Sequence, residues 1–233
     1  ASPSPETDAL RTLSQTEAVL TNETQAVNSA IGRAAATREA GIAEAQQFAT
    51  PLAEVAGSTD VAARAVADQA RADYVAALEA VVVPSALEPY TTPTVDEESL
   101  ASIGSAIDAV SVRSGEVAGT AETVADLQSQ LVALGRTFVA AMATFAATLP
   151  ASAEAIVDEN PDADESLGLA VSAAADAVAA SALATPESAA TLSAYATAVT
   201  ALRDDQERAE RAIAEQRARE EDERRRREQQ QSS

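Results

Sequence analysis

The fold is decided between residues 100 and 149, which read LASIGSAIDAVSVRSGEVAGTAETVADLQSQLVALGRTFVAAMATFAATL. Apolar residues recur there at intervals of three and four, the spacing that places side chains on one face of an α-helix. This series consists of Leu100, Ile103, Ile107, Val110, Val117, Ala121, Val124, Leu127, Leu131, Leu134, Phe138, Met142, Phe145 and Leu149. Thr94 and Glu97 have the spacing of a capping box, so we expect a helix from about residue 96 to 147, with the core around its bulky second half.

The same spacing fills most of the remaining chain. One heptad position of the first segment holds Leu13, Leu20, Val27, Ala34, Gly41 and Phe48, and the last segment holds Leu192, Tyr195, Val199, Leu202, Gln206, Ala209 and Ile213. We expect main helices over 5–48, 60–82, 96–148 and 163–231, the last interrupted near Thr185. The predicted fold class is all-α, an elongated helical bundle with coiled-coil-like N- and C-terminal helices that pair with each other, and a charged helical tail.

The longest stretch without helical spacing is Val83–Thr94, which contains Pro84, Pro89 and Pro93. Proline has no backbone N–H and a fixed φ, so this stretch is predicted to be a stiff loop. Tyr90 stands within it and is a candidate contact for a partner protein. Tyrosines also pack down to anchor long loops, and this second interpretation is the one that we favour.

Negative charge is concentrated in the first 202 residues, which hold 27 acidic residues and 7 arginines, whereas the remaining residues hold 10 and 9. The composition changes at the same point, from alanine-rich to Glu/Arg-rich. We therefore expect an acidic helical bundle over residues 1–202 and a charged helical tail over 203–233. A body this acidic repels phosphate backbones, so nucleic acid is not an expected partner.

The missing residue types restrict the chemistry. The chain has no histidine, cysteine or tryptophan, and all 16 of its cationic residues are arginine. Histidine, cysteine and lysine supply many of the general bases, nucleophiles and amines of enzymes, and neither a Ser-His-Asp nor a Ser-Lys arrangement can be assembled without them. The sequence therefore predicts no enzyme activity, no cofactor and no small-molecule substrate.

One acidic stretch deserves comparison with a calcium loop. Asp158, Asn160, Asp162 and Asp164 alternate like the oxygen ligands of an EF-hand. The sixth position is Ala163 where an EF-hand has glycine, and the twelfth is Leu169 where it has the bidentate glutamate. We therefore interpret the stretch as a solvated turn, in which Asp162 caps the following helix and Glu165 returns the bond, and expect no metal site.

The final segment combines charge with strong helical propensity. Its favourable i,i+4 pairs are Glu207–Arg211, Glu215–Arg219, Glu220–Arg224 and Glu223–Arg227. Such pairs support a solvent-exposed helix. The candidate contacts for a partner protein are its arginines Arg217, Arg219, Arg224, Arg225, Arg226 and Arg227.

Leu131–Leu149 is the best candidate for a membrane span, but it contains Arg136 and is diluted by alanine and threonine, so we expect a buried helix and no transmembrane segment in this chain. The chain begins Ala-Ser-Pro-Ser-Pro, which resembles an exported protein after signal-peptide removal. Arginine without lysine, combined with abundant alanine, is typical of a GC-rich bacterial genome. We therefore expect a secreted or cell-envelope protein.

Together these features predict a non-catalytic structural or protein-interaction protein, a helical spacer or adaptor that binds a protein partner or self-associates through its helices. The alternative is a secreted binding module or effector that recognises its partner through the Val83–Thr94 loop.

Overall fold

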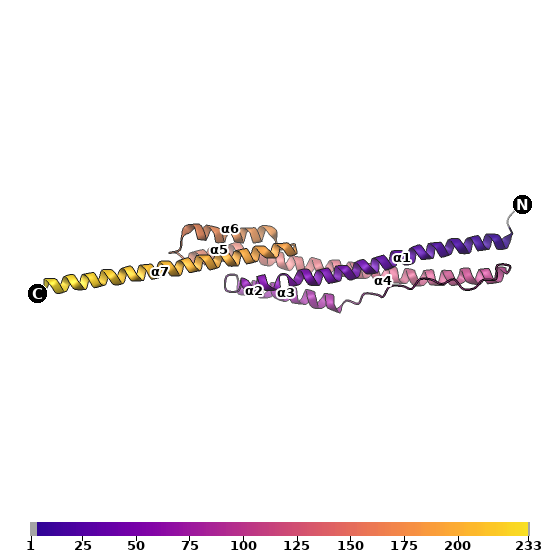
Figure 1. The fold of residues 1–233 in the computed structure, drawn as a ribbon, viewed down its shortest axis with the longest axis horizontal. Helices are drawn as coiled ribbons and strands as arrows, with labels where there is room; N and C mark the ends of the chain where they lie inside the picture. The colour runs from indigo at the N-terminus through magenta and orange to yellow at the C-terminus, as the bar shows by residue number, and fades with distance from the viewer. Residues whose placement is uncertain (1–3, 233) are drawn as a thin grey trace. The chain divides into compact units, whose positions relative to one another are not determined.

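The computed structural model describes residues 4–232. The chain is 82% helical, and the described residues contain no strand, which confirms the all-α prediction. Figure 1 shows the order of the helices. They are α1 (Pro5–Gln46), α2 (Ala49–Glu54), α3 (Val61–Ala80), α4 (Leu100–Ala146), α5 (Leu149–Asp158), α6 (Glu165–Ser181), the 3-10 turn η1 (Pro186–Ser188) and α7 (Ala189–Gln231).

Local sequence signals fix several helix ends. The Ser4 hydroxyl accepts a hydrogen bond from the Thr7 backbone N–H (3.3 Å) and Pro5 is the first residue of α1, as its fixed φ and missing N–H favour. Pro51 lies in the short helix α2, directly after the break that ends α1 at Gln46. Asp60 accepts a bond from the Ala63 N–H (2.7 Å) and so caps α3.

The helices form two compact units. Unit 1 combines residues 4–42 with 76–135, and unit 2 combines 43–75 with 136–232. This division follows contacts between residues, whereas the predicted division into a bundle over 1–202 and a tail over 203–233 follows composition. The predicted division stays a prediction.

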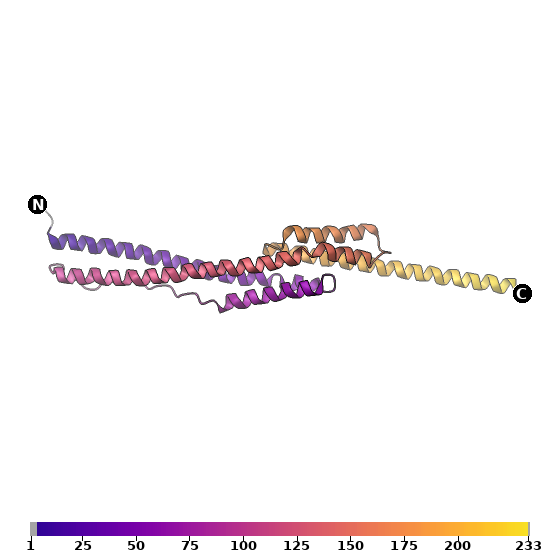
Figure 2. The ribbon, with the colours of Figure 1, turned by 180° about the vertical axis from the view of Figure 1, so that it is seen from behind.

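Unit 1 is built on α1 and α4. Its buried side chains are Leu13, Leu20, Val27 and Ile31 from α1 and Ala106, Val110, Val117 and Val124 from α4. The helices run in the same direction, because residues 15–19 lie opposite 107–114 and residues 23–27 lie opposite 114–121. Parallel helices need a long return connection, and part of it is residues 81–96, a segment without regular secondary structure that we call the strap (Figure 2).

The strap runs antiparallel to α1. Arg38 Nε donates to the Leu78 carbonyl (2.7 Å), whereas the Asn28 side chain, further toward the start of α1, bonds to Leu87. The prolines explain why this return is extended, since neither a helix nor a ladder of backbone hydrogen bonds tolerates them well.

Unit 2 contains the bulkiest core. Phe48 and Phe138 meet edge to face at 6.0 Å between ring centroids, and Tyr74 stacks on Phe138 at 4.8 Å. Met142 and Phe145 are also buried there, as expected for the second half of the helix that was predicted over 96–147. Helix α6 packs against α5 and α7, and α2 packs against α7.

The coiled-coil-like pairing of the first and last helices is not confirmed: Leu13, Leu20 and Val27 of the predicted seam pack in the cluster of unit 1, and the apolar residues of α7 pack in the core of unit 2. Two predictions of detail were wrong. Helix α4 begins at Leu100, after a turn in which the Asp96 carboxylate accepts from the Glu98 N–H (3.1 Å). The cap of α6 is Asp164, two residues later than predicted.

Candidate functional site

The strap is held to both helices of unit 1 by polar side chains. Asn28 of α1 makes two bonds to one strap residue: its Nδ2 donates to the Leu87 carbonyl (2.9 Å) and its Oδ1 accepts from the Leu87 N–H (2.7 Å). Arg113 of α4 donates to the Glu88 carbonyl (3.0 Å). The Asn28 side chain therefore pairs with both the N–H and the carbonyl of Leu87. The carbonyl of the next residue, Glu88, is paired with Arg113 of α4.

Apolar side chains of the strap also pack against α1 and α4. Val83, Leu87, Tyr90 and Val95 pack against the buried cluster of unit 1. The predicted contact residue Tyr90 is half-buried and its hydroxyl is buried without a hydrogen-bonding partner among the described residues. This position matches the anchor interpretation of Tyr90; its role as a partner contact stays a prediction.

Sequence reasoning missed Asn28 and Arg113. Asn28 and Ser29 are the polar residues in the otherwise apolar run Ala26–Ile31, and Arg113 is the only cation between Arg71 and Arg136. Their sequence surroundings mark these residues as unusual. They do not show that Asn28 forms hydrogen bonds with Leu87, which is 59 positions away in the chain.

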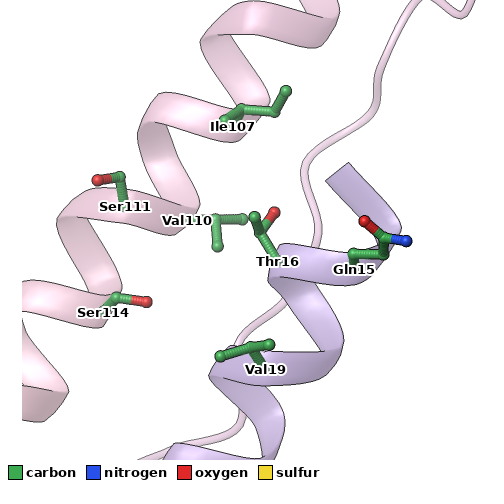
Figure 3. A pocket seen from close by; sticks show the side chains of 7 residues that line it. All are labelled: Gln15, Thr16, Val19, Ile107, Val110, Ser111 and Ser114. Carbon is green, nitrogen blue, oxygen red and sulfur yellow. The ribbon is translucent and has the colours of Figure 1, made fainter. Parts of the chain in front are cut away.

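Other edges of unit 1 have two shallow cavities between α1 and α4. The first, of about 370 Å³, is lined by Gln15, Thr16, Val19, Ile107, Val110, Ser111 and Ser114 (Figure 3). The second, of about 540 Å³, shares Ser114 and includes Glu23 as its titratable residue. Apart from the Glu23 carboxylate, the two linings consist of hydroxyls, one amide and small apolar side chains, so they offer packing, hydrogen bonding and a single acid–base group.

Unit 2 has a more polar cavity of about 550 Å³ beside the turn between α2 and α3. Asp60 and Glu159 line it, together with Ser58 and Ser152. The Asp60 backbone N–H donates to the Ser152 hydroxyl (3.3 Å), and the Asp60 carboxylate already caps α3. The polar groups of Asp60 and Ser152 therefore hold the turn in place.

The acidic stretch is occupied by structural hydrogen bonds. Asn160 Nδ2 donates to the Ile156 carbonyl (2.6 Å), and the Asp162 N–H donates to Gln206 Oε1 (2.7 Å). Asp158 is the last residue of α5. Among the described residues no group of three or more acidic side chains has an arrangement that could hold a metal ion.

Asp164 has the clearest electrostatic role in this stretch. Its Oδ1 accepts from both the hydroxyl and the backbone N–H of Ser166, and these bonds lower the pKa of the Asp164 carboxyl below its usual value. The Asp164 N–H in turn donates to Asp205 Oδ2 of α7 (2.8 Å). The stretch thus connects α6 to α7.

The predicted contact arginines lie on a fully exposed helix. Residues 214–232 are all exposed, and the ion pairs there are local: Glu215–Arg219 at 3.7 Å, Glu223–Arg227 at 3.7 Å and Arg224–Glu228 at 3.9 Å. Arg217, Arg225 and Arg226 make no ion pair in the described part of the chain. These side chains are accessible to a partner.

One helical stretch, Leu100–Asp158, is long and apolar enough to cross a membrane by length and composition alone, and 28% of its most apolar window is buried inside the protein. Core helices of soluble proteins meet the same criterion of length and composition. The criterion therefore does not distinguish a buried helix, as expected from the sequence, from a membrane span. Comparison with protein-family models, with curated proteins and with solved structures finds no match.

Proposed function

We propose that this protein is a non-catalytic helical spacer or adaptor whose exposed C-terminal helix engages a partner protein. The observation that supports this proposal most directly is the end of α7, where side chains from residue 214 onward are exposed and their ion pairs are formed within the same helix. The end of α7 does not pack against the rest of the protein, and its arginine and glutamate side chains are accessible to solvent. Such a helix is suited to contact another molecule.

The chemistry of the cavities agrees with a non-catalytic role. The first cavity of unit 1 is lined by apolar, hydroxyl and amide side chains, and the carboxylate of Asp60 in unit 2 is committed to capping a helix. Among the described residues, the hydroxyls of Ser58, Thr59, Thr148 and Ser152 in the unit 2 cavity form their hydrogen bonds with backbone groups and not with a carboxylate. The secreted or cell-envelope location expected from the sequence stays a prediction.

The test is retention of partner proteins on the immobilised full chain. We expect retention to be lost when the chain ends at Ile213 and when Arg224, Arg225, Arg226 and Arg227 are all replaced by glutamine. A matched control replaces Gln230 and Gln231 by alanine in the same exposed helix without changing its charge. Retention of the same partners by the shortened chain would show that the contact lies elsewhere and that the adaptor role of the tail is wrong.

A second function, recognition of a partner through the Val83–Thr94 loop, is favoured by exposure of the loop's outer edge. Pro89, Thr91, Thr92, Pro93 and Thr94 are exposed while Leu87 and Tyr90 face the helices. The variants Thr91→Asp and Thr92→Asp would abolish partner binding in this case and leave it unchanged if the tail is the contact.

A further inference from the structure

The strap leaves one side of the contact between α1 and α4 uncovered. The two cavities of unit 1 share Ser114 and so form one continuous groove (Figure 3). None of the strap residues, all of which the structure describes, lines either cavity. The lining runs from Gln15 to Val27 on α1 and from Ile107 to Ala121 on α4, a length of about 20 Å. We call this surface the groove.

The floor of the groove is apolar. Val27, Val110 and Val117 lie buried beneath it, and Val19 at its edge is 53% exposed. The remaining lining includes small residues that are exposed, namely Ala26, Gly115, Ala118 and Ala121. A third helix that lies along two packed helices covers a surface of this kind with apolar residues at positions i, i+3, i+4 and i+7.

Two glycines of α4 favour the close approach of another backbone. Gly115 lines the groove, and Gly104 lies on the same face of α4 because the eleven positions between them correspond to about three turns. A Cβ atom on either residue would meet no atom of another helix or of the strap within 4 Å. Glycine inside a helix is destabilising relative to alanine, but it lets a second backbone approach closely. Packing within the described chain therefore does not account for these glycines, whereas an additional helix would.

The edges of the groove are acidic. Glu23 lines it, and Asp108 and Glu122 lie three and four positions from residues of its lining, on the same face of α4. All three side chains are exposed, and in the described part of the chain none has an ion-pair partner. Arg113 is the one cation within residues 12–30 and 104–126, and it already bonds to the strap and to Glu116. Two copies joined through this groove would bring like charges together, whereas a basic helix is attracted to it.

We propose that the groove is a docking site for a helix of a partner protein, a helix with small apolar residues on one face and lysine or arginine beside that face. The small side chains allow close approach at Gly115, because the distance between packed helices depends on the side chains at their contact. The flanking cations pair with Glu23, Asp108 and Glu122. This site is separate from the C-terminal tail, so the inference does not depend on the function proposed for the tail.

The probe is a fluorescently labelled helical peptide of about 14 residues, the length of the groove, with alanine and valine on one face and lysine beside that face. Its anisotropy is measured with the full chain. We expect a peptide with glutamate in place of lysine to bind at least about tenfold more weakly. Gly115→Leu, which places a large side chain in the groove, should abolish binding. Gly32→Leu is the matched control and should change nothing, because Gly32 is an exposed glycine of α1 outside the groove with the same free space around it.

Charge variants distinguish docking from general attraction of a basic peptide to an acidic protein. Glu23→Gln/Asp108→Asn/Glu122→Gln should weaken binding at least about tenfold. The matched control removes the same charge from exposed positions outside the groove and should weaken binding less than about twofold; it is Glu39→Gln/Glu97→Gln/Glu98→Gln.

Three results would overturn the proposal. The first is absence of binding to the unaltered chain. The second is equal binding by the Gly115→Leu and Gly32→Leu variants when the circular dichroism of both matches that of the unaltered chain. The third is a dimer of the unaltered chain in analytical ultracentrifugation that Gly115→Leu dissociates, because a second copy would then occupy the groove.

Discussion

The hydroxyl of Tyr195 in α7 donates a hydrogen bond to the backbone carbonyl of Ser58, with 2.7 Å between the oxygens, and both residues are buried. Ser58 belongs to the turn between α2 and α3. Arg203, two helical turns further along α7, donates to the carbonyl of Gly57 in the same turn (2.8 Å). Gly57 has φ of 78°, a conformation that glycine adopts without strain. Two side chains of α7 therefore hold a turn that lies far away in the sequence.

Replacing Tyr195 by phenylalanine should lower the free energy of unfolding by about 1–2 kcal/mol, because the ring is retained but the buried Ser58 carbonyl loses its partner. Chemical denaturation followed by circular dichroism measures this loss. Tyr74→Phe is the matched control, since Tyr74 stacks on Phe138 and its hydroxyl makes no hydrogen bond among the described residues. Equal effects of the two substitutions would mean that the Tyr195 bond contributes nothing.

Alkaline pH should destabilise unit 2 through the same residue. Burial raises the pKa of Tyr195 to about 12, although the positive charge of Arg203 acts in the opposite direction. A folded-state pKa above the ordinary value of 10.0 means that the stabilisation is complete below pH 10 and is lost as the pH rises toward 12. Burial and the negative charge of Glu44 also raise the pKa of Tyr74, so absorbance titration should show two tyrosines that ionise above the ordinary value, with Tyr195 the later one. Tyr195→Phe should remove the step near pH 12 and flatten the alkaline loss of stability.

Acid should weaken the start of α6. The hydrogen bonds from Ser166 lower the pKa of Asp164, so the contribution of the carboxylate is present above its ordinary pKa of 3.8 and is lost as the pH falls through the lower folded value. Asp164→Ala should reduce stability at neutral pH, whereas Asp164→Asn, which keeps an acceptor oxygen, should retain most of it. Thermal unfolding at pH 7 and pH 3 compares them. An alanine variant as stable as the asparagine variant would contradict the capping role.

The predictable part of this fold is the part that depends on neighbours along the chain. Leu13, Leu20 and Val27 are buried as their spacing indicates, and the pairs Glu207–Arg211, Glu215–Arg219 and Glu223–Arg227 form as expected. Arg224 pairs with Glu228 rather than with the predicted Glu220, because both acids are four positions away on the same helix.

Long-range partners were not predictable in the same way. Many faces of this chain combine alanine with leucine or valine, so spacing alone does not show that α1 packs on α4 rather than on α7. Asp164 caps α6 instead of Asp162, whose carboxylate accepts a hydrogen bond from Gln206 Nε2 of α7 (3.3 Å). The hydrogen bonds of Asn28 depend on a strap residue 59 positions away for the same reason.

Ending the chain after Ile213 should leave the stability of the body almost unchanged, because the residues removed are exposed and their ion pairs are internal to the tail. A loss below about 1 kcal/mol corresponds to a shift in Tm of less than about 2–4 °C for a protein of this size. Ending the chain after Ala201 is the contrasting variant, since it also removes the buried side chains of Leu202 and Gln206, and it should be clearly less stable. A large loss of stability in the chain that ends after Ile213 would mean that the tail packs against the rest of the protein and is not free to contact a partner.

The tail should also be helical in isolation and sensitive to salt. Each i,i+4 pair contributes about 0.2–0.5 kcal/mol, and 1 M salt shortens the screening length to about 3 Å, so a peptide of residues 203–231 should lose helical signal in circular dichroism as salt is added. The variant Glu207→Gln/Glu215→Gln/Glu223→Gln removes the acidic partner of Arg211, Arg219 and Arg227. It should begin with less helix at low salt and respond less to salt. Helical content that is equal in both peptides at every salt concentration would show that intrinsic propensity alone maintains this helix, and the ion pairs would then have no part in presenting its arginines.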